Sequence, residues 1–362
     1  MIVSVISFSE KGYRLSQELA EADQAYRDRL RKRESVQYRL FSKWKGLPAQ
    51  EQVCPVEELA AWAEEQFAGH HALVFIGACG IAVRSIAPFV RDKMADSPVL
   101  VIDEKGQYVI PILSGHVGGA NRFARELAEA IGAGAVVTTA TDVNGKFAVD
   151  SFAEAWGFTI QNRQGIEEIS GRILNGERIT FAVEGLDAEQ CGAFLRERAG
   201  ETEGIVPVSA SDTEMPHIWV SGNRADAVLW LEPKAYILGM GCKKGKAFEE
   251  LRDFAEQELA KLQIPREAVW QIVSADRKRE ENGLLELADA WHVPFCTYEE
   301  NELAELKGGF SGSAFVEQTV GVDNVCERAA WAGCKEKGEF VLRKTAKDGM
   351  TLAVVRRDWR AV

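Results

Sequence analysis

The chain has 362 residues, of which 46% are hydrophobic and 27% charged, and this composition is typical of a soluble globular protein. Its length favours two or three domains over a single core. The formal net charge is -12. Because phosphate binding needs a positive surface, we expect no nucleic-acid partner. A few cations gathered in one site would still bind an acidic small ligand.

No stretch of the sequence approaches the roughly 18 apolar residues that span a bilayer. Residues 1–8 lack a basic segment and a small-residue cleavage site, so they predict a β-strand rather than an export signal. The cysteines number seven, are scattered singly and form no C-x-x-C pair, which argues against disulfides and zinc. We therefore expect a cytoplasmic protein with reduced thiols and no membrane partner.

Strand-like and helix-like segments alternate along the chain, which predicts a multi-domain α/β fold with mainly parallel sheets flanked by helices and a variable middle domain. Residues 2–7 predict the first strand, and a helix follows from about Lys11. The basic segment 27–45 is interpreted as a solvated helix face or connector. Further strands are predicted at residues 72–76, 99–102, 108–113 and 135–139, with a turn at 104–106 between the second and third of these.

The rest of the chain continues the same alternation and ends in a hairpin. Predicted strands follow at residues 179–183, 218–220, 228–231, 236–238, 268–274 and 295–298, and predicted helices near 187–198, 247–262 and 322–334. Residues 340–342 and 350–355 predict the closing hairpin. We expect three domains, at residues 1–146, 147–232 and 233–362. Among the histidines, we expect His70 and His71 to be solvated, and His217 and His292 to be structural.

Three glycine-rich turns follow predicted strands, and they read GACG at 77–80, SGHVGG at 114–119 and GMGCKKG at 239–245. Glycine lets the backbone approach a ligand, and the start of a following helix favours anions. In open α/β sheets, ligands bind at the carboxyl ends of strands. These turns are therefore the candidate ligand sites.

Each candidate has an alternative interpretation. The third turn is one residue off the dinucleotide fingerprint, so a nucleotide site, another anion site and a plain tight turn all remain open, although Lys243 and Lys244 favour an anion. His116 is either a general acid or base or a loop histidine bonded to its own backbone. The polar residues 138–146 suit substrate contacts or an ordinary turn at Asn144-Gly145. The absence of a G-x-S-x-G elbow argues against a serine hydrolase.

Several of these segments resemble one known family. Three segments are similar to the amino-terminal domain of the CbiG family of cobalt-precorrin-5A hydrolases. They are FIGACGIAVR at 75–84, PILSGHVGGAN at 111–121 and TTATD at 138–142. LGMGCKKG at 238–245, SADRK at 274–278 with Glu281, and the later Gly321-Val322 and Glu327 segments resemble its carboxy-terminal part. Trp331 departs from the smaller residue expected in that last helix.

The resemblance implies an enzyme of anaerobic cobalamin biosynthesis. Its substrate would be a cobalt-bound tetrapyrrole that carries acetate and propionate groups. The reaction would open the substrate's δ-lactone and release a two-carbon fragment as acetaldehyde. The cobalt would arrive inside the substrate, so we expect no cofactor and no protein-bound metal.

We assign His116 and Asp142 as the candidate catalytic residues, with His116 as general base or acid and Asp142 orienting it or acting as the base. Backbone N–H groups of Gly118 and Gly119 would stabilise an oxyanion. The candidate substrate-binding residues lie on the glycine turns, on the cations beside them and on the polar segments that the resemblance covers. They are Gly77, Gly80, Arg84, Ser114, Gly115, Gly118, Gly119, Asn121, Arg122, Thr141, Lys146, Gly239, Gly241, Lys243, Lys244, Ser274, Asp276 and Lys278.

Two other classes of function stay open at this point. A non-catalytic tetrapyrrole carrier would need the same cations but no acid–base pair, and it would release no acetaldehyde. A nucleotide-dependent α/β enzyme would be stabilised thermally by NAD or ATP. The sequence leaves open a homodimer and transfer contacts with neighbouring enzymes of the pathway.

Overall fold

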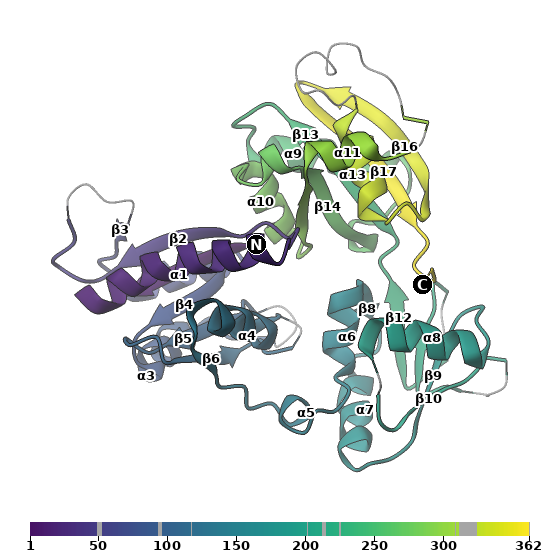
Figure 1. The fold of residues 1–362 in the computed structure, drawn as a ribbon, viewed down its shortest axis with the longest axis horizontal. Coiled ribbons are helices and arrows are strands. Elements are labelled where there is room, and N and C mark those ends of the chain that lie inside the picture. The colour runs from purple at the N-terminus through teal and green to yellow at the C-terminus, as the bar shows by residue number, and fades with distance from the viewer. Residues whose placement is uncertain are drawn as a thin grey trace. The chain divides into compact units, whose positions relative to one another are not determined.

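The computed structural model describes residues 1–48, 53–92, 96–116, 118–200, 202–211, 215–223, 226–307, 309–310 and 324–361. The chain forms two compact units (Figure 1). Unit 1 combines residues 1–136, here the N-terminal lobe, with residues 236–357, here the C-terminal lobe. Unit 2 combines residues 137–235 with 358–362. The predicted α/β class is confirmed, and the division into three domains after residues 146 and 232 stays a prediction.

The sheet of the N-terminal lobe has the strand order β3-β2-β1-β4-β5-β6-β7 in the described part of the chain. All its neighbours are parallel except β5 and β6, which form an antiparallel hairpin. The strands are β1 Ile2–Ser7, β2 Gln37–Ser42, β3 Cys54–Pro55, β4 Ala72–Ile76, β5 Val99–Ile102, β6 Tyr108–Leu113 and β7 Gly134–Ala135. Residues 136–139, which were predicted to extend the last strand, do not belong to it.

Helices cover both faces of this sheet. Alternate side chains of a strand point to opposite faces, so Val3 and Val5 of β1 pack on one side and Ile6 on the other. Helices α1 (Glu10–Arg29) and α4 (Ala120–Ile131) bury the first face, and α2 (Leu59–Ala68) and α3 (Cys79–Ile86) bury the second. In the described residues, the helices cover the faces and leave the two ends of the strands for ligands. We call the end where the parallel strands begin the amino edge, and the end where they stop the carboxyl edge.

The basic segment 27–45 runs from the end of α1 through β2, and most of its charged side chains are exposed or half-buried, as expected for a connector. One cation departs from that interpretation. Arg27 is buried and forms an ion pair of 2.7 Å with the buried Asp23. The segment then pairs with the outer edge of the C-terminal sheet, where Ser35 N donates to Phe295 O at 2.7 Å and Thr297 N donates to Arg33 O at 2.9 Å. It therefore joins the two lobes of unit 1 by main-chain hydrogen bonds.

The sheet of the C-terminal lobe has the order β15-β14-β13-β17-β16 in the described residues. Its strands are β13 Tyr236–Cys242, β14 Val269–Ala275, β15 Phe295–Tyr298, β16 Gly338–Lys347 and β17 Met350–Arg357, and the last two confirm the predicted hairpin. Helices α9 (Phe248–Lys261) and α10 (Asn282–Ala290) cover one face. Helices α11 (Glu300–Glu305) and α13 (Val325–Gly333) cover the other.

Unit 2 has its own sheet, of order β10-β9-β11-β12-β8 in the described residues. The strands are β8 Phe158–Ile160, β9 Ile179–Val183, β10 Ile205–Pro207, β11 Ile218–Val220 and β12 Leu229–Pro233. The helices are α5 Ala140–Val143, α6 Val149–Trp156, α7 Gln164–Leu174 and α8 Ala188–Ala199. Within the described ranges of the whole chain, no helix is long and apolar enough to cross a membrane.

His71 is buried between α2 and β4, so the prediction that it is solvated is wrong. Its Nδ1 lies 2.9 Å from Oε1 of Gln66, which also accepts a hydrogen bond from Ser4. Because the amide oxygen is an acceptor, His71 carries its proton on Nδ1. Burial lowers the pKa of His71 from 6.5 to about 4, so the folded protein holds this imidazole neutral.

We predict that the free energy of unfolding falls as the pH drops from about 6.5 towards 4, since the unfolded chain then binds a proton that the folded chain rejects. The contribution of His71 amounts to up to about 1.4 kcal/mol per pH unit in that window. Denaturant unfolding of the wild type and of His71→Asn at several pH values measures it. If the free energy of unfolding changed equally with pH in the two proteins, His71 would not be the group responsible.

Candidate functional site

The first two glycine turns lie at opposite edges of the N-terminal sheet. Leu113 at the end of β6 pairs with Val99, which pairs with Leu73 near the start of β4. Ser114 therefore emerges at the amino edge, where the parallel strands begin. Gly77 emerges at the carboxyl edge, where they end, and its N–H donates to Ile102 O at 2.8 Å.

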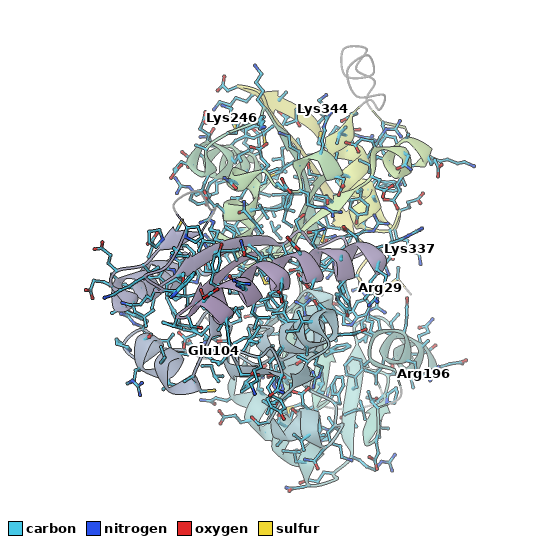
Figure 2. All side chains as sticks on the ribbon, turned by 60° about the vertical axis from the view of Figure 1, so that its left-hand side comes forward. Arg29, Glu104, Arg196, Lys246, Lys337 and Lys344 are labelled. Carbon is cyan, nitrogen blue, oxygen red and sulfur yellow. The ribbon has the colours of Figure 1, made fainter. Side chains whose placement is uncertain are left out.

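Gly77, Gly80 and Arg84 form the carboxyl-edge group. A Cβ atom at Gly80 would lie 3.3 Å from Nη1 of the exposed Arg84, so the guanidinium lies over this turn. Glu104, which accepts a hydrogen bond from Ser9, follows β5 at the same edge and is labelled in Figure 2. The two edges are roughly 15 Å apart, given a rise of about 3.3 Å per residue. Helices cover both faces between the two edges, so this group lies apart from the turn at 114–119, and its contact with substrate stays a prediction.

The turn at 114–119 closes on the start of α4. The N–H groups of Gly119, Ala120 and Asn121 donate to the carbonyl oxygens of His116, Ser114 and Gly115 at 2.9, 3.1 and 2.8 Å. The N–H of Gly119 is therefore already bonded within the turn, and its role as an oxyanion donor stays a prediction. Val117 lies outside the described residues.

The side chains around this turn are closely packed. Ser114 adopts a positive φ of 56°, and its hydroxyl donates to Asp96 O at 2.7 Å. A Cβ atom at Gly118 would lie 2.4 Å from Cβ of Ser114, so only glycine fits there. Asn121 is buried with its Oδ1 beneath Gly115. His116 is half-buried at the amino edge. The role of the Gly118 N–H as an oxyanion donor stays a prediction.

Arg122 lies on the first turn of α4 at the junction between the lobes. Its Nη1 is 3.5 Å from Oε2 of Glu34 and 3.7 Å from Oε1 of Glu126. Glu34 in turn pairs through its backbone with Cys296 of β15. Arg122 thus already has carboxylate partners, and its predicted contact with substrate would have to replace or share them.

Two segments of the C-terminal lobe meet at the carboxyl ends of β13 and β14. The hydroxyl of the buried Ser274 donates to Met240 O at 2.7 Å. Lys278 Nζ lies 2.6 Å from Oε2 of Glu281, and both side chains are largely buried. Oε1 of the same carboxylate accepts the Gly245 N–H at 2.7 Å. The turn at 239–245 and the segment 274–281 therefore form one cluster, as parallel neighbouring strands require.

Cys242 and Glu281 belong to this cluster but were not assigned to the site from the sequence. Burial raises the pKa of the Cys242 thiol, so it is protonated at neutral pH. Burial acts to raise the pKa of Glu281, but hydrogen bonds from Lys278 and from the Gly245 N–H outweigh it and hold that pKa below its ordinary value. The three-residue spacing of Lys278 and Glu281 is the sequence signal that would have indicated the pair.

Two of the three glycines of the third turn, Gly239 and Gly241, serve packing. A Cβ atom at Gly239 would lie 1.9 Å from Cys326 O of α13, and one at Gly241 would lie 2.8 Å from the Thr351 hydroxyl. Lys243 and Lys244 are exposed, and the Lys243 N–H donates to Gly349 O at 2.9 Å. Lys246, one residue beyond the turn, is labelled on this lobe in Figure 2.

Asp276 connects this cluster to the N-terminal lobe. Its Oδ1 accepts a hydrogen bond from the Thr297 hydroxyl at 2.8 Å and lies 2.7 Å from Arg279 Nη2. Arg279 also reaches Asp28 at 3.2 Å, at the end of α1. Gln37, which starts β2 at the amino edge, donates to Asn282 Oδ1 at 2.7 Å, next to Glu281. The C-terminal cluster therefore adjoins the amino edge, on which the His116 turn also lies.

The remaining predicted residues belong to unit 2. Thr141 is buried, Asp142 accepts a hydrogen bond from Thr139 at the start of α5, and Lys146 pairs with Glu203 at 2.5 Å. Because His116 is in unit 1, its pairing with Asp142 stays a prediction. Within the described ranges, no three His, Cys, Asp or Glu side chains are grouped to hold a metal ion. The later Gly321-Val322 segment lies outside those ranges.

Comparisons with known proteins match both lobes. The family described as cobalamin synthesis G, N-terminal, matches residues 61–142, and its C-terminus counterpart matches residues 236–355. A cobalt-precorrin-5A hydrolase of Salmonella typhimurium is 34% identical over 302 residues, which cover 81% of this chain and 84% of the relative. A second one, from Priestia megaterium, is 30% identical over 308 residues, covering 81% and 80%.

One solved structure also aligns along nearly the whole chain. It is described as a cobalamin biosynthesis protein G homologue from Sulfolobus solfataricus, with 23% identity, coverage of 98% of this chain and 97% of that one, and a TM-score of 0.40.

We predict that Gly239→Ala lowers the free energy of unfolding by about 1–3 kcal/mol or more without any ligand, because the methyl group would overlap a backbone oxygen. Gly171→Ala is the matched control, since a Cβ atom there meets nothing within 4 Å in helix α7. That change should be neutral or stabilise by up to about 1 kcal/mol. Urea unfolding measures both. A fully stable Gly239→Ala protein would show that this glycine is not needed for packing.

Proposed function

Because the chain belongs to the CbiG family of cobalt-precorrin-5A hydrolases, we propose that it hydrolyses cobalt-precorrin-5A and releases acetaldehyde. The observation that carries the proposal is the 34% identity to a curated hydrolase over 84% of that relative. The chain is accordingly an enzyme of cobalamin biosynthesis. The release of acetaldehyde, the absence of a cofactor, the cytoplasmic location, a homodimer and transfer contacts with pathway enzymes stay predictions.

The proposed reaction consumes one water molecule. Water adds to the acyl carbon of the lactone, the acyl C–O bond breaks, and a carboxylic acid and an alcohol result. The alcohol then loses its proton to a base and becomes the carbonyl of acetaldehyde as its carbon separates from the ring. The electron pair of the broken C–C bond passes into the conjugated macrocycle and is protonated there. Both steps need a group that moves a proton near neutral pH.

We place the substrate at the amino edge of the N-terminal lobe, where the C-terminal cluster adjoins it. This edge carries the half-buried imidazole of His116, and His116 is the general acid or base of the proposal. The contacts of Gln37 with Asn282 and of Arg279 with Asp28 hold the C-terminal cluster against this edge. The group of Gly77, Gly80 and Arg84 lies outside the proposed site, since it is at the other edge.

The charges at this junction suit a polycarboxylate. The turn at 239–245 exposes Lys243 and Lys244 to solvent, so they are available to acetate and propionate groups. Lys278 is held by Glu281 at 2.6 Å, so its role is to position the turn unless substrate displaces that carboxylate. A local group of cations thus attracts an anionic substrate to a chain whose net charge is -12.

The nucleotide alternative loses its structural basis. In a dinucleotide site, glycines let the backbone approach a pyrophosphate. Here the space in front of Gly239 is filled by the backbone of α13, and the space at Gly241 by Thr351. The carrier alternative is distinguished from the hydrolase by whether adding the protein to cobalt-precorrin-5A releases acetaldehyde.

We predict that His116→Ala slows acetaldehyde release by roughly 10²–10⁴ fold, the usual effect of removing a general acid or base. Arg84→Ala is the control, because that charged residue of the same lobe lies at the opposite edge, and its rate should stay near wild type. Turnover of purified cobalt-precorrin-5A with a coupled aldehyde assay measures both. Wild-type turnover in His116→Ala would remove the histidine from the mechanism.

A further inference from the structure

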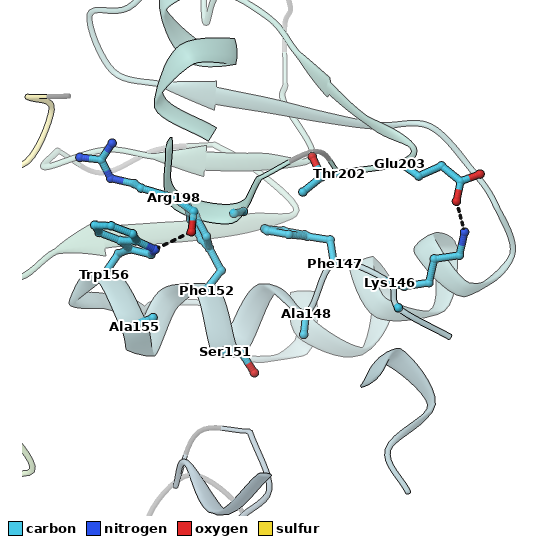
Figure 3. Close-up of a pocket in the computed structure, with 12 residues that line it drawn as sticks. Lys146, Phe147, Ala148, Ser151, Phe152, Ala155, Trp156, Arg198, Thr202 and Glu203 are labelled. Carbon is cyan, nitrogen blue, oxygen red and sulfur yellow. Dashed lines mark hydrogen bonds and ion pairs between the residues drawn. The ribbon is translucent and has the colours of Figure 1, made fainter. Parts of the chain in front are cut away.

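A cavity of about 330 Å³ opens within unit 2 (Figure 3). It lies between helix α6, the segment that precedes it and the segment that follows α8. Its size is at the lower end of the range that binds small ligands. No role has yet been given to this cavity, and it belongs to one compact unit of the chain.

The wall of the cavity is aromatic and firmly supported. Phe147, Phe152 and Trp156 line it. The ring of Phe147 lies 5.3 Å from that of Phe152, which lies 5.9 Å from the fully buried Phe181 in the core of the unit. The indole N–H of Trp156 donates to Arg198 O at 3.0 Å. Because these rings are held by the core and by a backbone bond, they offer a preformed surface for a flat, apolar group.

Two residues that line the cavity, Lys146 and Glu203, form an ion pair. Lys146 Nζ lies 2.5 Å from Oε2 of Glu203, and the side chain of Glu203 is 84% exposed whereas that of Lys146 is 24% exposed. Exposed pairs of this kind contribute about 0–1 kcal/mol. A carboxylate on a ligand can therefore replace Glu203 at little cost, and it would find the ammonium already in position.

The other cation of the lining is committed elsewhere. The guanidinium of Arg198 donates to Trp359 O and to Ala361 O, at 3.4 and 2.9 Å, and lies over the rings of Phe194 and Trp156. Figure 3 shows it directed away from Phe147 and Lys146. Recognition of an anion in this cavity therefore falls to Lys146.

We propose that this cavity binds a flat, apolar ring that carries a carboxylate, with the ring on Phe147 and Phe152 and the carboxylate on Lys146 in place of Glu203. The proposal goes beyond the reaction proposed above and does not depend on it, because binding here is measured without turnover.

The test titrates the full-length protein with 2-naphthoate, a flat apolar ring that carries one carboxylate, by isothermal titration calorimetry. Lys146→Ala should weaken binding about tenfold through loss of a charge-assisted hydrogen bond. Glu203→Gln should tighten binding about threefold, because it removes a competing carboxylate. Lys261→Ala, which breaks a similar lysine–glutamate pair on α9, should bind like wild type.

The opposite signs separate ligand recognition from a structural role. If the pair only stabilised the fold, Lys146→Ala and Glu203→Gln would change binding in the same direction. Sodium propionate, which has the carboxylate but no ring, should bind the wild type much more weakly than 2-naphthoate does. No 2-naphthoate binding to the wild type, or equal binding to wild type and Lys146→Ala, would overturn the proposal.

Discussion

The reversal of chain direction between β5 and β6 decides where the histidine-bearing turn lies. A parallel strand in the place of β6 would have brought residues 114–119 to the carboxyl edge, beside Gly77. The antiparallel pairing of Val99 with Leu113 brings them instead to the amino edge. The proposed active site at the lobe junction depends on this reversal, since the C-terminal lobe adjoins the same edge through Gln37 and Asn282.

Main-chain pairing makes the two lobes of unit 1 one body. Residues 33–36 add to the outer edge of β15, which would otherwise expose unpaired backbone groups. Ile2 of the first strand packs into the core of the C-terminal lobe. The buried pair of Arg27 and Asp23 holds the end of α1 from which this segment departs. A junction built from backbone bonds and core packing fixes geometry more firmly than surface ion pairs alone.

The sequence predicted most strands, because their apolar runs are short and bounded by glycine-rich turns. The turn at 239–245 and the segment 274–281 lie together because neighbouring parallel strands end at one edge, and the strand pairing that shows this comes from the structure. The sequence did not reveal which edge each turn occupies, because that depends on long-range pairing. Charge normally indicates solvent, and only the fold shows that Arg27, at the start of the basic segment 27–45, has a buried carboxylate partner. Gly239 resembled a ligand-binding glycine, since close approach of a helix and of a ligand select the same residue.

The central claim is that one substrate contacts the amino edge of the N-terminal lobe and the cluster of the C-terminal lobe. Amide hydrogen exchange with and without cobalt-precorrin-5A, followed by mass spectrometry, tests it most directly. Our account predicts slower exchange in peptides that contain residues 114–122 and 239–246, and no change in peptides that contain residues 77–84. Protection of residues 77–84 with no change at residues 114–122 would contradict it.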